Sequence, residues 1–165
     1  MDRLIYLKGK VEVACSTFAG LLMIAMSIIA VWQVVSRYVL NSPSTNTEEA
    51  LRYLMIWMGF FGATYCFGRN THLSITLLEN KLNPKNYFYL KVIQITVVCI
   101  TILISSIYGG YHFVVSSFSQ YSPTLGISMS LIYAIIPVSG LLILFLCICN
   151  LLILIEESRE GNYGC

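Results

Sequence analysis

Long runs of uncharged, mostly apolar residues dominate this chain. Residues 13–36 contain no charged side chain, and neither do residues 92–155. A membrane-spanning helix needs about 20 consecutive apolar residues, so the first run is long enough for one such helix and the second for two. The pattern predicts an all-α integral membrane protein.

A weaker apolar run covers residues 53–68. At 1.5 Å per residue it is about 24 Å long, which is short for a hydrocarbon core about 30 Å thick. We therefore expect its helix to begin near Glu48. Asn46 or Thr47 is a suitable N-cap, and Glu48 and Glu49 then lie in the first turn, where the helix dipole favours negative charge.

The longest run is divided by residues 116–126, which are rich in hydroxyl groups and carry Pro123 and Gly126. This composition predicts a loop. Pro137 lies inside the helix that follows and predicts a kink there, which neighbouring membrane helices can accommodate. Residues 1–165 therefore form one predicted domain with four spans, at about 13–39, 48–68, 89–115 and 128–155.

Leucine and isoleucine interleave with polar side chains over residues 73–82, just before Pro84. This pattern predicts a short helix on the membrane surface after the second span. A partly buried loop explains the same pattern equally well.

Charged residues make up 11% of the chain, whereas an ordinary soluble domain has about 25%. So few charges exclude a soluble enzyme and a nucleic-acid-binding protein. Eight of the 10 Lys and Arg residues lie before the first span, between the second and third spans, or after the fourth. Because cytoplasmic loops carry the excess of Lys and Arg, we expect both termini in the cytoplasm. Arg37 and Arg52 are the two on the opposite side.

The chain's cysteines and histidines do not predict a cofactor site. In the predicted topology His72 and His112 lie at opposite faces of the membrane, so they cannot ligate one haem. The 6 cysteines all fall on the reducing, cytoplasmic side, where they serve as small apolar packing residues. We expect no cofactor and no enzymatic activity.

Transport pathways through a membrane are usually marked by ionisable residues at mid-depth. The predicted spans carry none near their middles, so the chain is a poor candidate for a transporter or channel by itself. The alternative is a free-standing four-helix protein, either a homo-oligomeric pore or a redox membrane subunit.

Pairs of small residues four positions apart let membrane helices approach closely. Such pairs are Ser16 and Gly20, Gly59 and Ala63, Ser105 and Gly109, and Ser106 and Gly110. They predict helices that pack against one another or against a partner protein.

Four charged residues lie near the outer ends of the first two spans: Arg37, Glu48, Glu49 and Arg52. Because residues three or four apart share a helix face, either glutamate can pair with Arg52. Arg37 ends the preceding helix and can reach either carboxylate. The cluster is either a clamp that closes this helical hairpin or a docking surface for a protein in the outer compartment, and these interpretations are compatible.

A succession of motifs passes through the same region. It consists of Gln33-Val-Val-Ser-Arg37-Tyr38, Glu48-Glu49, Trp57-xx-Phe60-Phe61-Gly62-Ala63 and Arg69-xx-His72-Leu73-Ser74-Ile75. In order and spacing it resembles the small membrane subunit of tripartite ATP-independent periplasmic (TRAP) transporters, the DctQ-like family, over residues 33–78. Asn46 stands where the family has a tryptophan two positions before the paired glutamates.

The resemblance implies a small subunit that braces a large membrane subunit and helps to receive a periplasmic substrate-binding protein. The large subunit takes up an organic acid, such as a C4-dicarboxylate or a sialic acid, together with sodium. The implied location is the inner membrane of a Gram-negative bacterium, with membrane lipid as a further partner and no nucleic acid. Residues expected at a helix-packing or partner interface are Trp57, Gly59, Gly62, Ala63, Arg69 and His72.

Overall fold

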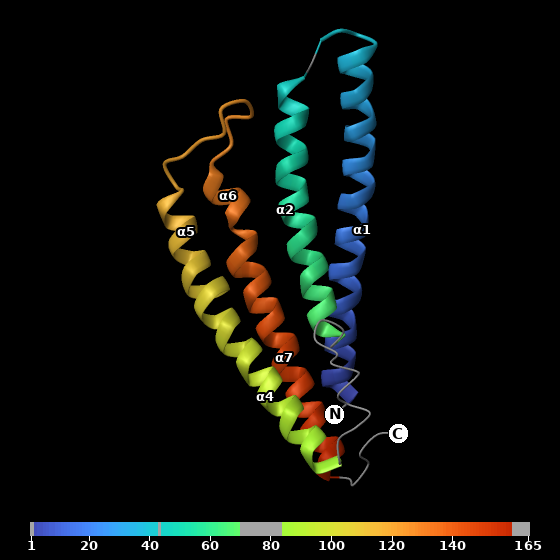
Figure 1. The fold of residues 1–165 in the computed structure, drawn as a ribbon, viewed down its shortest axis with the longest axis vertical. Coiled ribbons are helices and arrows are strands. Elements are labelled where there is room, and N and C mark those ends of the chain that lie inside the picture. Colours follow the sequence, from blue (N-terminus) through green and yellow to red (C-terminus); the bar gives the residue numbers. More distant parts are fainter. Residues whose placement is uncertain (1, 43, 70–83, 160–165) are drawn as a thin grey trace.

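A computed structural model describes residues 2–42, 44–69 and 84–159, and these are mostly helical (Figure 1). In chain order the helices are α1 (Asp2–Tyr38), α2 (Thr45–Gly68), α4 (Pro84–Ile102), the π-helix η2 (Leu103–Gly109), α5 (Gly110–Ser116), α6 (Met129–Tyr133) and α7 (Ile135–Arg159). The described ranges hold no β-strand and a single isolated bridge between Tyr121 and Ser128. The all-helical prediction is therefore confirmed.

The helices form long rods that lie side by side in the order α1, α2, α7 and α4 (Figure 1). The rod of α4 continues through η2 and α5, and α6 and α7 are separated by Ala134 alone. Both chain ends lie at one end of the bundle, here called the terminal end. The turn over residues 39–44 and the loop over residues 117–128 lie at the other end, here called the loop end. The pairs α1–α2 and α4–α7 converge at the terminal end and separate toward the loop end.

Three helical stretches are long and apolar enough to cross a membrane: Arg3–Tyr38, Tyr89–Ser116 and Met129–Glu156. Helix α2 is not among them, and its first turns carry Glu48, Glu49 and Arg52. It nevertheless runs alongside α1 over much of its length (Figure 1). A membrane protein is the consistent interpretation, and the count of four spans and the cytoplasmic termini stay predictions.

The helix boundaries refine the sequence expectations. Helix α1, which contains the predicted span 13–39 up to Tyr38, begins at Asp2, and Lys8 pairs with Glu12 one turn later, at 3.6 Å. Helix α2 begins at Thr45 with Ser44 as its N-cap, so the prediction of Asn46 or Thr47 as the N-cap was wrong. The third rod begins at Pro84, a residue suited to the first helical turn because its missing N–H would have no partner there.

The third rod and α7 pack closely against each other. A Cβ added at Gly140 would lie 2.7 Å from the Cβ of Ser106, and one added at Gly110 would lie 3.2 Å from the Cδ of Pro137. The predicted small pair Ser106 and Gly110 is therefore confirmed as a close-packing face. Gly109 faces away from this contact, since the nearest atom to an added Cβ is the carbonyl oxygen of Ile104, 3.5 Å away.

The core continues from this contact toward the terminal end. Its buried members are Ile95 and Ile102 of α4 and Ile143 and Cys147 of α7, with Phe67 of α2 packed against them. Between membrane helices such side chains stabilise by van der Waals packing and not by leaving water. The core thus joins both rod pairs where they converge.

The fourth rod is interrupted near Pro137, as expected. Helix α6 ends at Tyr133 and α7 begins at Ile135, because Pro137 has no N–H to donate to the carbonyl of Tyr133, four residues earlier. The predicted surface helix over residues 73–82 lies outside the described residues.

The predicted loop between the last two rods is held by its own hydrogen bonds. The Ser122 N–H donates to the Ile127 carbonyl at 2.9 Å, and the Met129 N–H donates to the Gln120 carbonyl at 2.9 Å. Gly126 adopts a φ of 66°, a left-handed conformation that glycine enters at little cost. The loop therefore presents one defined shape at the loop end.

Candidate functional site

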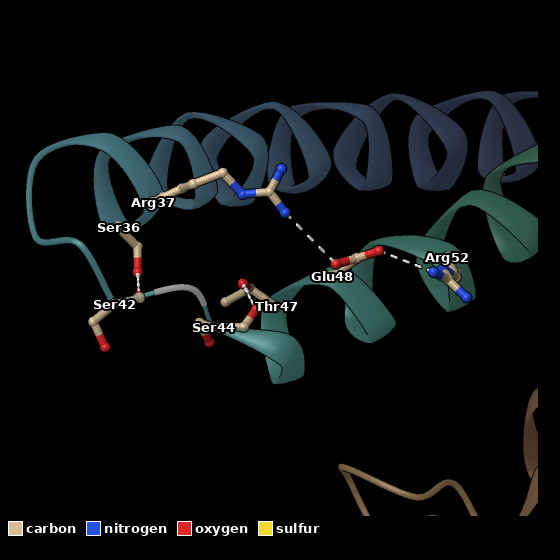
Figure 2. A network of polar contacts seen from close by, with 7 residues as sticks. All are labelled: Ser36, Arg37, Ser42, Ser44, Thr47, Glu48 and Arg52. Atoms are coloured by element: carbon tan, nitrogen blue, oxygen red, sulfur yellow. Dashed lines mark hydrogen bonds and ion pairs between the residues drawn. The ribbon is translucent and has the colours of Figure 1, made fainter.

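Three of the four charged residues singled out in the sequence form a network around Glu48 (Figure 2). Its Oε1 lies 2.9 Å from Nη2 of Arg52, and its Oε2 lies 4.0 Å from Nη2 of Arg37. The side chains are 45% exposed for Glu48, 53% for Arg37 and 72% for Arg52. Exposed ion pairs contribute little to stability, typically about 0–1 kcal/mol. The network therefore orients charge at the loop end more than it holds the helices together.

The turn over residues 39–44, which joins α1 to α2, has a specific backbone shape. The Ser36 hydroxyl donates to the Ser42 carbonyl, and the Thr47 hydroxyl donates to the Ser44 carbonyl at 2.8 Å (Figure 2). Asn41 has a φ of 48°, a conformation that asparagine tolerates better than most residues. These bonds set the direction in which α2 returns and so place Glu48 opposite Arg37.

Glu49 has a different set of partners from Glu48. It accepts a hydrogen bond from the Tyr53 hydroxyl, one turn along α2, and its Oε2 accepts one from the backbone N–H of Thr124 at 3.2 Å. Tyr53 in turn lies 3.6 Å from the sulfur of Met129. Glu49 therefore ties α2 to the distant loop over residues 117–128. The adjacent glutamates thus have separate partners: Glu48 faces Arg37 of α1, and Glu49 contacts the 117–128 loop.

Trp57 extends this link deeper into the bundle. Its indole N–H donates to the carbonyl of Ile132 in α6 at 3.1 Å. Its ring lies 6.3 Å from that of Phe61, which lies 5.0 Å from the ring of Phe18 in α1. Trp57 thus connects α2 to α6, and Phe61 next to it connects α2 to α1.

The remaining predicted interface residues lie apart from this site. Gly59 and Gly62 are open, since a Cβ added at either would meet nothing within 4 Å, and Ala63 is half-buried. Arg69 follows α2 at the terminal end, with its guanidinium 5.4 Å from the ring centre of Tyr65. His72 lies outside the described residues.

A polar contact at the terminal end was missed by the sequence reasoning. The Asn150 amide in α7 donates to the carbonyls of Gly68 at 3.2 Å and Phe67 at 3.4 Å. Glu12 of α1 lies against the same turn, since a Cβ added at Gly68 would be 2.9 Å from its Cγ. Asn150 is an amide in an otherwise apolar helix. Because a buried amide needs hydrogen-bond partners, this residue could have indicated the contact.

The chain matches the family model described as tripartite ATP-independent periplasmic transporters, DctQ component, over residues 26–157. The chain belongs to this family. It is 32% identical over 140 residues to a Haemophilus influenzae protein provisionally named a TRAP transporter small permease protein, covering 84% of this chain and 83% of that one. It is also 32% identical over 124 residues to the Vibrio cholerae sialic acid TRAP transporter small permease protein SiaQ, covering 75% and 71%.

A longer relative matches as well. The Haemophilus influenzae sialic acid TRAP transporter permease protein SiaT is 31% identical over 132 residues, which are 76% of this chain and 20% of SiaT. These relatives are transporter subunits and not enzymes, and the resemblance seen in the sequence is confirmed. The motif residues Arg37, Glu48, Glu49 and Trp57 fall inside the matched range.

The part of this TRAP small subunit that the structure describes offers no metal site, since no three His, Cys, Asp or Glu side chains gather there. Among the described residues, the Asp, Glu, Lys and Arg side chains lie toward the two ends of the rods, and the core between them is apolar.

Proposed function

We propose that this TRAP small permease subunit braces a large permease subunit and presents its loop end to a periplasmic substrate-binding protein. The observation that carries the proposal is the separate use of Glu48 and Glu49. Glu48 links the end of α1 to α2 through Arg37, and Glu49 links the 117–128 loop to α2, so that the loop end has a defined, charged surface.

The large partner is inferred from the relatives and from the open faces of the helices. SiaT matches this chain over only 20% of its length, so we infer that a separate large subunit here supplies what the rest of that chain does. Gly59 and Gly62 are open, which suits the close approach of a partner helix. Bracing also fits the uncharged middles of the spans.

The cargo is proposed from the names of the relatives and from the family. Two relatives are named as sialic acid transporters, so the class we favour is an organic acid, a sialic acid or a C4-dicarboxylate, taken up with sodium. The proposed placement is the Gram-negative inner membrane with four spans, both termini cytoplasmic and the loop end periplasmic.

Co-purification and reconstitution test the bracing role. A tagged subunit should capture a multi-spanning protein from its native membrane. Liposomes with both subunits, the binding protein and a sodium gradient should accumulate labelled organic acid, whereas liposomes with the small subunit alone should not. Uptake by the small subunit alone, or full uptake by the large subunit without it, would contradict the proposal.

Charge reversals test the docking role. Arg37→Glu and Glu49→Arg should lower uptake by the assembled transporter about fivefold to tenfold at normal expression, because a changed charge at a docking surface slows association. Lys10→Glu, an equal change at the terminal end, is the matched control. A docking role predicts that added binding protein partly restores uptake. Unchanged uptake in both loop-end variants would refute the docking role.

A further inference from the structure

Between α1 and α2, toward the loop end, lies an apolar groove of about 480 Å³. Its walls carry four methionines, Met23 and Met26 of α1 and Met55 and Met58 of α2. Met23 is 62% exposed and Met55 is 59% exposed. Methionine is flexible and polarisable and adapts to irregular apolar partners.

Other lining residues keep the groove apolar and shallow. Ala30, whose side chain is small, lines the groove. Ser27 also lines it, but its hydroxyl donates to the Met23 carbonyl at 2.9 Å and so is satisfied within α1. Inside the groove, therefore, the surface favours hydrocarbon.

Charge is confined to the mouth of the groove. Glu48 and Arg52 line it, and Arg37 pairs with Glu48 from the other helix. Two guanidinium groups and one carboxylate leave one net positive charge. Arg52 contacts Glu48 through Nη2, which leaves further N–H donors on a group that has five. Guanidinium groups bind phosphate well because their donors match its oxygens.

The length of the groove matches one membrane leaflet. From Glu48 to Met58 the helix rises about 15 Å, which is half of a hydrocarbon core about 30 Å thick. The charged mouth then lies at the depth of lipid headgroups and the methionines lie at the depth of acyl chains.

A volume of about 480 Å³ along a length of about 15 Å leaves room for a single acyl chain.

We infer that this groove binds one anionic phospholipid, with an acyl chain along the methionines and the phosphate at Arg52 and Arg37. The inference rests on the proposed function only in placing the loop end at a membrane surface. Lipid binding requires no transport, so its failure can be told apart from a failure of the proposed function.

The test is native mass spectrometry of the full-length chain, delipidated in detergent and titrated with dioleoyl phosphatidylglycerol. One lipid should bind more tightly than the rest. Ala30→Phe fills the groove and should weaken that site at least about tenfold, whereas Val31→Phe adds the same bulk on the next, outward-facing position and should leave it unchanged. Equal effects of the two variants, or no saturable site, would overturn the inference.

The headgroup is tested without adding bulk. Arg52→Gln should weaken phosphatidylglycerol binding about fivefold to tenfold, as loss of one charge-assisted contact implies, while Lys10→Gln at the terminal end should not. Dioleoylglycerol, which lacks the phosphate, should bind the wild-type chain as weakly as phosphatidylglycerol binds the Arg52 variant. Equal binding of the two lipids to the wild-type chain would overturn the assignment of the phosphate.

Protein occupants give a different result. If the large permease subunit or a second copy of this chain fills the groove, forming that complex should expel the lipid, and Ala30→Phe should weaken the complex. Expulsion of the lipid, or weakening of the complex by Ala30→Phe, would show that a protein and not a lipid occupies the groove in the complex. Circular dichroism of each variant confirms that its helices are retained.

Discussion

At the scale of single residues, polar side chains hold helix α2 at both of its ends. Near its N-terminus, Glu49 accepts hydrogen bonds from Tyr53 and from the backbone of Thr124. At its C-terminus, Asn150 donates to the carbonyls of Gly68 and Phe67. The Asn150 contact suits its place, because a helix presents unpaired carbonyls at its end. The Thr124 and Asn150 contacts each join α2 to a segment far away in the chain.

Replacing Asn150 should show what the terminal contact contributes. Asn150→Leu keeps a similar size but leaves two helix-end carbonyls without their donor, so the free energy of unfolding should fall by about 1–3 kcal/mol. Asn46→Leu, at the exposed start of α2, should change it by less than about 0.5 kcal/mol. Denaturant titration of both variants in detergent measures the difference. Equal effects would mean that the amide does not hold α2.

At the scale of helices, the third and fourth rods approach closely because two glycines and a serine leave room. Gly110 faces Ile136 and Pro137, and Gly140 faces Ser106. The contact falls where η2 widens the third rod and next to the break in the fourth. Irregular backbone is tolerated inside a membrane bundle where neighbouring helices cover it.

Two adjacent glycines provide a matched test of this packing. In Gly110→Ala the new Cβ would lie 2.9 Å from Cγ2 of Ile136, so the rods must shift and stability should fall by about 1–3 kcal/mol. In Gly109→Ala it meets no neighbouring helix, and the gain in helix propensity should raise stability by up to about 1 kcal/mol. Thermal unfolding in detergent compares them. A loss in Gly109→Ala equal to that in Gly110→Ala would show that the contact is not tight.

At the scale of the whole molecule, both chain ends lie at the terminal end and both connections described by the structure lie at the loop end. Because the rods lie side by side, we expect all of them to cross the membrane if one of them does. The excess of Lys and Arg at the terminal end favours a cytoplasmic terminal end.

Cysteine labelling measures this topology. In a Cys165→Ser background, Ser42→Cys and Ser119→Cys should react with a membrane-impermeant maleimide in intact spheroplasts. Lys10→Cys and Tyr89→Cys should react only after the membrane is permeabilised. The reverse pattern would invert the orientation. Reaction of Ser42→Cys and Tyr89→Cys from the same side would show that α2 does not cross the membrane.

The helices were predictable because their signal is local. Apolar runs placed all four rods, and the hydroxyl-rich segment with Pro123 and Gly126 placed the loop between the last two. Helix ends were less predictable, as at Asp2 and Thr45, because polar residues just outside an apolar run also adopt helix. The π-helix over Leu103–Gly109 was not predicted, because the apolar run that contains it is uninterrupted there.

By itself, the sequence determined that the protein is helical and apolar, that its charges lie at the rod ends, and that its motifs are those of TRAP small subunits. Periodicity, composition and motif order are properties of neighbouring residues, so one chain suffices to see them. Only the tertiary structure decided that Glu48 pairs with Arg37 as well as with Arg52, that Glu49 reaches the distant loop, and that Asn150 holds the end of α2. These partners are 75 or more positions apart in two of the three cases, and only packing of the rods brings them together.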